Sequence, residues 1–293
     1  MSFQNSTITV VLNGYKRQEF LNLQINAVRN QTIPPDEILI WNNGDYIDFK
    51  NFDKNIFIAN SSKNFGVWSR FSFALNAETE YICVLDDDTI PGKSFFENCL
   101  STMQISPGLL GARGLRFLSK NRYEPHKSFG WDNPNEELKV VDIVGHAWFF
   151  KKEWLCYFWR ELPLSNSSRL VGEDIHFSYT LQKYAGIKTI VPPHPVKNKD
   201  YWGSDPLMAL RLGTGIESIS QHNSALDNFD KVLSIYTSAG FKLNKDEKDE
   251  RHLVIGPGIT RFAIIKKIAN KFPIVRKLGK NFKSFLASRH IYI

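Results

Sequence analysis

The sequence predicts an α/β protein with a mostly parallel sheet flanked by helices. Short β-branched or aliphatic runs alternate with stretches of helical spacing in the first part of the chain, and this alternation is typical of βαβ units. The chain is 42% hydrophobic and 23% charged, as expected for a protein that buries a full core. Its 293 residues are enough for one large domain with an extension.

The elements in the first third of the chain follow from local patterns. Ile8–Leu12 is a short β-branched run, typical of a strand that is buried on both faces. The next stretch has apolar residues at helical spacing and ends before Pro34-Pro35. The expected elements are strands at Ile8–Leu12, Glu37–Trp41, Asn55–Ala59 and Tyr81–Leu85, a helix at Gln18–Asn30, and a helix marked by Val67, Phe71, Ala74 and Leu75.

The middle of the chain is less regular. Gly172-Glu173-Asp174 is expected to open a helix, because apolar residues follow it at helical spacing. Gly108, Gly111 and Gly114 match no phosphate-binding pattern, so we interpret them as turn or close-packing glycines. The remaining expected strands are Leu109–Phe117, Leu138–Val144 and Ile187–Val191.

Three consecutive aspartates, Asp86-Asp87-Asp88, directly follow the strand Tyr81–Leu85. Neighbouring carboxylates repel one another, and a divalent cation with a preference for oxygen ligands, Mg²⁺ or Mn²⁺, would relieve that repulsion. In an extended segment Asp86 and Asp88 point the same way and Asp87 points the opposite way. A cation held there would neutralise a diphosphate leaving group. The alternative interpretation is a polar turn that closes the strand.

Several classes of protein are excluded by missing motifs. The chain has no GxxxxGK[ST] loop and no GxGxxG after its first strand, which argues against a P-loop NTPase and a dinucleotide oxidoreductase. Its three cysteines form no CxxC pair, which argues against a structural zinc site and favours reduced thiols in the cytoplasm. We expect no signal peptide and no membrane-spanning segment, since no apolar run approaches about 20 residues.

Positive charge is concentrated at the end of the chain. The net charge is +7, but Arg251–Ile293 contains ten basic residues and no acid, so residues 1–250 carry −3. Apolar residues in this segment recur at helical spacing and are interleaved with lysines, which predicts a helix lying on an anionic membrane surface. The alternatives are packing on the main domain, formation of a homodimer, or binding of nucleic acid, which the acidic main body disfavours.

Seven motifs stand in a characteristic order. They are Asn13-Gly14-Tyr15-Lys16-Arg17, Gln31-Thr32-Ile33-Pro34, Asn42-Asn43-Gly44, Asn64-Phe65-Gly66 with Arg70 and Asn76, Leu85-Asp86-Asp87-Asp88 with Pro91, Val144-Gly145-His146, and Gly172-Glu173-Asp174. In this order and spacing the chain resembles glycosyltransferases of the GT-A fold, most closely those of family 2, over about residues 6–195. The resemblance implies a GT-A catalytic domain at residues 1–242 and leaves residues 243–293 as a basic amphipathic helical tail.

The resemblance also implies a role for individual residues. Asp88 would bind Mn²⁺ or Mg²⁺, and Asp174 would be the general base that deprotonates the acceptor hydroxyl. His194 would complete the metal sphere, with His222 as a rival candidate. Asp86 would contact the ribose of the donor or a water on the metal. The other residues that would bind the sugar-nucleotide are Asn13, Asn42, Arg70 and Asp87.

The implied reaction is transfer of a sugar from a nucleotide-diphosphate donor, a UDP-sugar in the simplest case, to a hydroxyl of a saccharide or lipid-linked acceptor. We expect inversion at the sugar, a role in surface polysaccharide or glycan assembly, and a cytoplasmic enzyme attached peripherally to the membrane. Asn42 stands where the family often has an aspartate near the base, so the base stays open.

Three alternatives remain from the sequence. The aspartate triplet followed by Thr89 also resembles exostosin-like transferases, which retain the anomeric configuration. Phosphohydrolases with an aspartyl nucleophile place a DxDx[TV] motif after a strand, but here Ile90 stands at the last position. The third alternative is a non-enzymatic membrane adaptor, in which the aspartate triplet would be only a polar turn that closes the strand.

Overall fold

A computed structural model of the protein describes residues 6–15, 18–44, 54–164, 171–204 and 225–244. By compactness the chain divides into two units, residues 1–244 and residues 245–293. The second unit lies outside the described residues, and so does nearly all of the basic tail predicted from the sequence.

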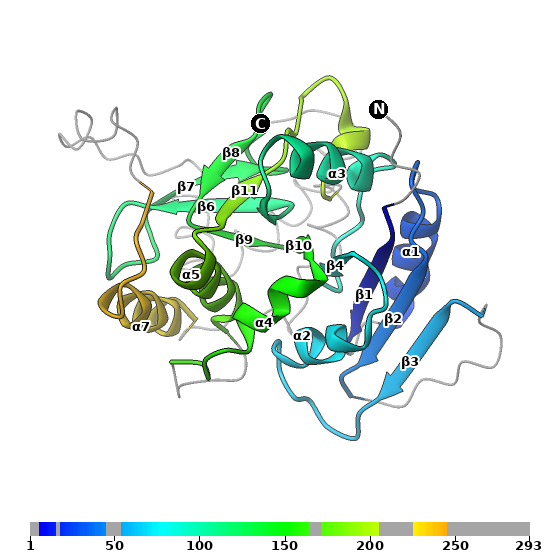
Figure 1. The fold of residues 1–293 in the computed structure, drawn as a ribbon, viewed down its shortest axis with the longest axis horizontal. Coiled ribbons are helices and arrows are strands. Elements are labelled where there is room, and N and C mark those ends of the chain that lie inside the picture. The colour runs from blue at the N-terminus through cyan, green and yellow to red at the C-terminus, as the bar shows by residue number, and fades with distance from the viewer. Residues whose placement is uncertain (1–5, 16–17, 45–53, 165–170, 205–224, 245–293) are drawn as a thin grey trace, which may run out of the picture. The chain divides into compact units, whose positions relative to one another are not determined.

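The first unit contains a large mixed sheet in the strand order β3-β2-β1-β4-β10-β5-β11-β8 (Figure 1). Strands β1 to β4 pair in parallel, as do β5 and β11, whereas β10 is antiparallel to β4 and β5 and β8 is antiparallel to β11. The predicted α/β architecture is confirmed. The strands are β1 Ile8–Gly14, β2 Glu37–Asn42, β3 Ile56–Asn60, β4 Tyr81–Leu85, β5 Gly108–Leu110, β8 Lys139–Val141, β10 Ala147–Lys151 and β11 Lys188–Val191.

A second, small sheet has the order β7-β6-β9, with β6 at Arg113–Phe117, β7 at His126–Gly130 and β9 at Ile143–Gly145. The single strand expected at Leu109–Phe117 is therefore two strands in two sheets, divided at Gly111. A Cβ on Gly111 would lie 2.3 Å from the Val144 Cβ, so only glycine allows β9 to approach this closely. The strand expected at Leu138–Val144 is divided in the same way, into β8 and β9.

Helices cover both faces of the large sheet. The loop after α1 bonds to the loop before α3, through the Thr32 amide and the Lys93 carbonyl at 2.8 Å. On the other face, Phe71 of α2, Phe158 of α4 and Phe177 of α5 pack with ring centroids 4.8–5.8 Å apart, and Figure 1 shows these three helices in a row. The helices are α1 Gln18–Arg29, α2 Ser69–Phe73, α3 Phe95–Ile105, α4 Leu155–Phe158, α5 Glu173–Ala185 and α7 Ala225–Ser238, with 3-10 turns at Ala74–Asn76, Lys152–Trp154 and Lys199–Tyr201.

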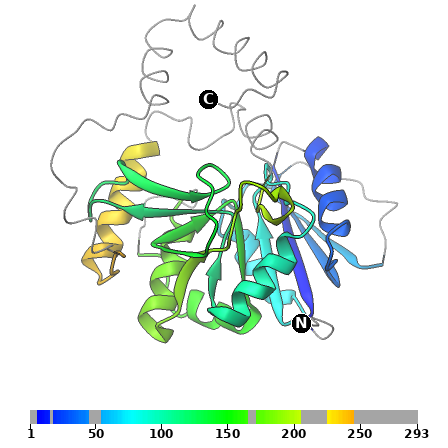
Figure 2. The same ribbon diagram turned by 90° about the horizontal axis from the view of Figure 1, so that it is seen from above.

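The last of the described helices, α7, packs beside α5 (Figure 2). Val232, Leu233 and Tyr236 of α7 form a second buried cluster with residues of α5 and the small sheet. This cluster anchors α5, which begins with Glu173 and Asp174.

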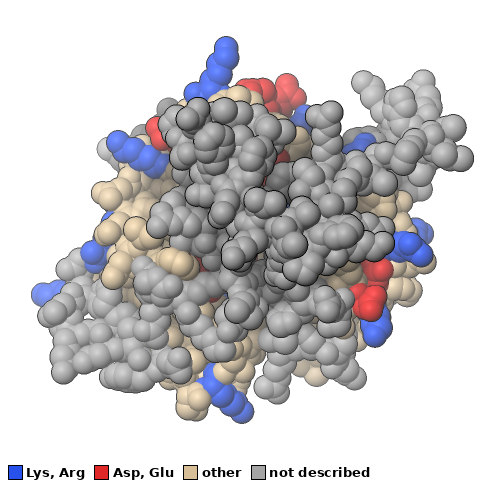
Figure 3. Space-filling view, turned by 180° about the vertical axis from the view of Figure 1, so that it is seen from behind, with Lys and Arg blue, Asp and Glu red and all other residues tan. Residues whose placement is uncertain are grey.

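Among the described helices, none has the length and apolar character that crossing a bilayer requires. On the face drawn in Figure 3, the visible lysine and arginine side chains of the described residues are scattered around the outline and do not gather in one patch.

Candidate active site

The aspartate triplet lies at the carboxyl end of β4, in the centre of the large sheet. Its main chain is held by Gln24 of α1. The side-chain amide of Gln24 donates to the carbonyls of Asp86 (2.6 Å) and Thr89 (3.0 Å). The Thr89 amide also donates to the Asp86 carbonyl, at 3.1 Å. This fixed turn presents the aspartate side chains at the edge of the sheet where ligands of parallel sheets bind.

His146 lies opposite the triplet because of the strand register. β10 is antiparallel to β4 and pairs Ala147 with Leu85, so the residue before Ala147 meets the residue after Leu85. The Asp86 amide donates to the His146 carbonyl at 3.0 Å, and the Thr89 hydroxyl donates to the same carbonyl at 2.9 Å. His146 has a φ of +63°, a left-handed conformation that is uncommon for residues other than glycine.

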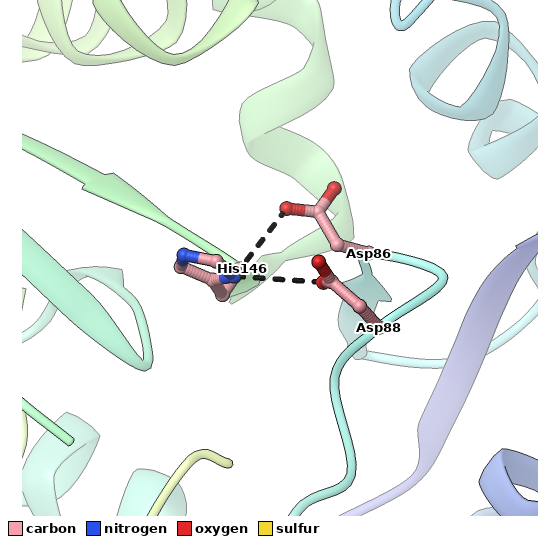
Figure 4. Close-up of side chains that lie close together, drawn as sticks. All are labelled: Asp86, Asp88 and His146. Atoms are coloured by element: carbon pink, nitrogen blue, oxygen red, sulfur yellow. Dashed lines mark ion pairs between the residues drawn. The ribbon is translucent and has the colours of Figure 1, made fainter. Parts of the chain in front are cut away.

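Asp86, Asp88 and His146 converge on one point (Figure 4). The Nδ1 atom of His146 is 3.6 Å from an Asp88 carboxylate oxygen and 3.9 Å from an Asp86 oxygen. Both aspartates thus face His146, as expected from the sequence, but the segment is a turn closed by the Thr89-to-Asp86 backbone bond and not the extended segment on which that expectation was based. Burial lowers the pKa of His146, but Asp88 and Asp86 outweigh burial and raise that pKa above its usual value.

These three residues fit a divalent cation. Their candidate ligand atoms all lie within 4.8 Å of one another. Two atoms that bind one ion at about 2.1 Å each lie at most about 4.2 Å apart, and both measured separations from His146 satisfy this limit. The His146 Nδ1 atom is also buried without a hydrogen-bond partner within the described residues. Two carboxylates and an imidazole are suitable ligands for a divalent transition metal.

Arg70 of α2 joins the triplet to the start of α5. Its guanidinium bonds to the carboxylates of Asp86 and, at 2.8 Å, of Glu173. The arginine side chain is only 3% exposed and lies over the Trp148 ring, 4.4 Å from its centroid. Burial lowers the pKa of Arg70, but the two acids outweigh burial and raise it. The guanidinium therefore stays charged and joins segments that are far apart in the sequence.

Glu173 and Asp174 form the first turn of α5, after Gly172 with a φ of +96°. Burial raises the pKa of both carboxyl groups, and Arg70 counteracts that rise. The charge of Asp86 is near enough to raise the pKa of Asp174 further. The Ile175 amide donates to an Asp174 oxygen at 2.7 Å, which fixes the orientation of this carboxylate. The geometric link between the start of α5 and the aspartate triplet is the ion pair of Arg70 with Glu173, the residue before Asp174.

A cavity of about 600 Å³ lies at the carboxyl ends of β1, β2 and β3. The residues that line it are Tyr15, Gly44, Asn60, Ser61, Ser62, Lys63 and Asn64. Its position at the edge of a parallel sheet is suited to a nucleotide. In the same part of the sheet, Asn13 of β1 follows Leu12, the register partner of Leu85, and so lies beside Asp86.

The sequence was compared with models of known protein families. The model described as glycosyl transferase family 2 matches residues 6–158, just over half of the chain. The chain belongs to the family 2 glycosyltransferases. A solved structure, S. aureus TarS, is similar with 12% sequence identity and a TM-score of 0.42. The match covers 86% of this chain and 46% of TarS, so the chain spans less than half the length of TarS. No curated protein matches the sequence.

Two of the residues that we assigned to the nucleotide in this glycosyltransferase have partners inside the protein. The Asn42 side chain is 1% exposed and donates to the Asn60 side chain at 2.7 Å, so it fixes the cavity wall. Arg70 is engaged by Asp86 and Glu173. Asn13 has a buried side-chain oxygen without a hydrogen-bond partner in the described residues, and Asp87 is half-buried between its two neighbours.

The structure places His194 differently from the sequence prediction. The His194 Nδ1 atom donates to the Pro192 carbonyl at 2.8 Å, because a carbonyl can only accept. The Gly203 amide then donates to the other ring nitrogen at 3.0 Å, so neither nitrogen has a lone pair left for a metal. The histidine that lies beside Asp86 and Asp88 is His146. His222, the rival candidate, lies outside the described residues.

Sequence reasoning missed His146 as a site residue, although the Val144-Gly145-His146 motif was noted. The signal that was present is a histidine directly after a glycine between two short apolar runs. Glu173 was noted only as part of a helix start, and nothing in the local sequence points to its ion pair with Arg70.

Proposed function

We propose that the protein transfers a sugar from a nucleotide-diphosphate donor to a hydroxyl group of a saccharide or lipid-linked acceptor, in a reaction that depends on Mn²⁺ or Mg²⁺. One observation carries this proposal. Arg70 connects Asp86 with Glu173, and Asp174, the acid that we assign to deprotonate the acceptor, directly follows Glu173 in the first turn of α5. A UDP-sugar is the donor that we favour.

On the donor side, Asp86, Asp88 and His146 would hold the cation, which when bound would stabilise the charge on the departing diphosphate. The cavity beside Asn60 and Lys63 would take the nucleoside. Asn13 supports this arrangement, since its side-chain oxygen has no hydrogen-bond partner within the described residues, its strand position is next to Asp86, and the oxygen could accept from a ribose hydroxyl.

On the acceptor side, Asp174 would accept the proton of the attacking hydroxyl. A positioned carboxylate contributes on the order of 10² to 10⁴ in rate when its pKa suits the working pH. The raised pKa of Asp174 improves that match. Direct attack by the deprotonated hydroxyl on the anomeric carbon gives inversion, and we favour surface polysaccharide or glycan assembly as the setting.

A thermal-shift panel of nucleotide-sugars, each with and without Mn²⁺, tests the proposal. We expect at least one donor to raise the melting temperature only when Mn²⁺ is present. The Asp88→Ala variant should lose this shift, and Asp132→Ala, which removes a surface acid paired with Arg113, should keep it. A shift that persists in Asp88→Ala would contradict the assignment of Asp88.

Further measurements on the same purified protein distinguish the proposed reaction from the alternatives. A phospho-aspartate at Asp86 detected by mass spectrometry would indicate a phosphohydrolase. The anomeric configuration of the product, measured by NMR, distinguishes inversion from retention. If no nucleotide-sugar binds with any divalent cation, the protein is not a metal-dependent transferase.

We also propose that the basic tail attaches this enzyme peripherally to the cytoplasmic face of a membrane. The support is the sequence alone, which places ten basic residues and no acid in Arg251–Ile293 with apolar residues at helical spacing. Attachment there would suit a lipid-linked acceptor. Formation of a homodimer is the competing use of this segment.

A further inference from the structure

We propose that Arg113 of the small sheet binds an anionic group of the acceptor, a phosphate or a carboxylate, in the open space in front of Gly145. The proposal rests on the proposed sugar transfer and names the chemical class of acceptor that this site would take. It is carried by the direction of the Arg113 side chain, the space beside it and the way its guanidinium is held.

The face of β6 that carries Arg113 is turned toward the start of α5. Side chains alternate along a strand, so Arg113 lies on the same face as Leu115. Leu115 packs in the buried cluster that contains Ile175, the residue after Asp174. Gly114 lies on the opposite face, where an added Cβ would clash with strands of the large sheet. Arg113 therefore extends on the side of the small sheet on which α5 begins.

Strand pairing places open space beside Arg113. β6 is antiparallel to β9 and pairs Arg113 with Gly145, the residue before His146. Side chains of directly opposite residues in such a pair lie on the same face, next to each other. A Cβ at Gly145 would meet no atom of the described residues within 4 Å. A ligand group can therefore lie beside the guanidinium, one residue from His146.

The guanidinium of Arg113 is oriented by one bond and keeps further donors. Its Nε atom donates to an Asp132 oxygen at 2.6 Å, and the described residues offer no hydrogen-bond acceptor to its two Nη groups. The side chain is 27% exposed, so a ligand can reach these groups. Two Nη groups of a planar guanidinium form a fork that matches the oxygens of a phosphate or a carboxylate.

Tyr123 is near both Arg113 and the proposed base. Burial raises the pKa of Tyr123, the charge of Asp174 raises it further, and the charge of Arg113 lowers it. The ring stacks on Phe229 of α7, with centroids 4.8 Å apart. The Tyr123 hydroxyl makes no hydrogen bond within the described residues, so it is available as a second donor to the same anion.

The location of Arg113 favours the acceptor over the donor. The cavity proposed for the nucleoside lies at the ends of β1, β2 and β3, whereas Arg113 lies beside the turn between β9 and β10, on the other side of β4. The proposed base, Asp174, stands next to a second acid, Glu173. These acids would repel an anionic acceptor, and Arg113 supplies the positive charge that holds one there.

The test is an NMR titration of the full-length protein labelled with ¹⁵N-arginine. The probes are glycerol phosphate and glucuronate, with glycerol and glucose as their neutral counterparts. All titrations are made at one ionic strength, because salt screens contacts between an anion and a partly exposed arginine. The Arg113 Nε–H signal is identified by its absence from Arg113→Gln, and saturation transfer to the probe gives the affinity in every variant.

Three variants change the subsite in different ways. Arg113→Gln removes the charge, Gly145→Val fills the open space, and Tyr123→Phe removes the hydroxyl but keeps the ring. The matched control is Arg160→Gln, since Arg160 is exposed and lies over Tyr184, at the opposite end of α5 from Asp174. Thermal unfolding checks that all variants fold.

We expect glycerol phosphate or glucuronate to shift the Arg113 signal, and glycerol and glucose to leave it unchanged. The anion that binds more tightly distinguishes a phosphate-bearing acceptor from a carboxylate-bearing one. Affinity should fall about tenfold or more in Arg113→Gln and Gly145→Val, fall less in Tyr123→Phe, and stay unchanged in Arg160→Gln. No shift with either anion, or full affinity in Arg113→Gln or in Gly145→Val, would overturn the proposal.

A second titration distinguishes the acceptor from the donor. It is made with Mg²⁺ and a nucleotide-sugar that binds in the thermal-shift panel. The anion should still bind, because donor and acceptor occupy the site together. Loss of anion binding under these conditions would assign Arg113 to the donor diphosphate and overturn the proposal.

The outcomes also separate this proposal from the proposed function. A protein that binds a nucleotide-sugar with a divalent cation, but whose Arg113 signal responds to neither anion, would keep the function and refute the subsite. An Arg113 signal that responds to an anion in a protein that binds no nucleotide-sugar would support the anion site and refute the function.

Discussion

Arg70 is a buried cation with two acidic partners, of which Glu173 is 9% exposed and Asp86 is 28% exposed. Its side chain is 3% exposed, contacts the Trp148 ring and forms ion pairs with Asp86 and Glu173. Two acids from separate elements thus depend on a single cation. Removing one partner of a buried ion pair leaves an uncompensated charge, which is far more costly than the net stabilisation of the pair.

The Arg70→Met variant should therefore lose about 3–5 kcal/mol of unfolding free energy at neutral pH. Arg70→Lys keeps the charge but cannot bond to two carboxylates in the same fork, so its loss should be smaller. Urea unfolding measures both values. Equal losses in the two variants would show that packing on Trp148, and not charge, dominates.

At Asp174 the prediction concerns turnover. Asp174→Asn should keep donor binding, since we assign this residue to the acceptor, and should lower kcat at least about a hundredfold because an amide cannot accept the proton. Steady-state kinetics with a donor found in the thermal-shift panel measures this. Unchanged turnover in Asp174→Asn would remove Asp174 from the mechanism.

The carboxyl group of Asp174 should also set the pH dependence of kcat/KM. Burial, with a contribution from Asp86, raises the pKa of Asp174 to about 6. A general base works only when deprotonated, so kcat/KM should decline as the pH falls through about 6, whereas an ordinary aspartate would stay active to about 4. An acid limb near pH 4 in the pH–rate profile would contradict this prediction.

At the scale of elements, α7 supports the helix that begins with Asp174. His176 of α5 donates from Nε2 to the Phe158 carbonyl at 2.8 Å, so its Nδ1 accepts from the Tyr236 hydroxyl at 2.9 Å. The Leu164 amide donates to the same hydroxyl at 3.3 Å. Burial lowers the pKa of His176, consistent with a neutral ring. One hydroxyl thus links α7, α5 and the segment after α4.

Tyr236→Phe should destabilise the protein by about 1–3 kcal/mol, because it leaves the His176 Nδ1 atom and the Leu164 amide without a partner. The control is Tyr157→Phe, since the Tyr157 hydroxyl has no hydrogen bond among the described residues and this change should be nearly neutral. Urea unfolding compares the two. A neutral Tyr236→Phe would indicate that the cluster is held by apolar packing alone.

The elements that the sequence predicted and those that it missed differ in a physical way. Strand Tyr81–Leu85 was predicted with its observed bounds, because an aliphatic run before a polar turn is a local signal. Strand β10 was missed, since Ala147–Lys151 is aromatic on both faces and shows no alternation. Its status as a strand depends on pairing with β4 and β5.

At the scale of the whole molecule, the positive net charge comes from the basic tail, which has ten basic residues and no acid in Arg251–Ile293. Reversing the charge of Lys266, Lys267 and Lys271 to glutamate in the full chain should weaken binding to anionic vesicles. Each basic residue contributes about 1 kcal/mol there, so we expect a loss of at least about a hundredfold. Sedimentation with vesicles measures this, and arginine at the same three positions is the control. Unchanged binding would refute membrane attachment through these lysines.

By itself, the sequence determined the alternation of strands and helices, the aspartate triplet at the end of a strand, and the likeness to family 2 glycosyltransferases. These are signals of composition and spacing within a few tens of residues, which hydrophobic periodicity and turn residues encode locally. Only the tertiary structure decided that His146, and not His194, faces the triplet. It also decided that Arg70 joins Asp86 to Glu173, although Arg70 and Glu173 are 103 residues apart in the sequence. Strand register and helix packing across the sheet fix such contacts, because they arise from non-local pairing that no local pattern specifies.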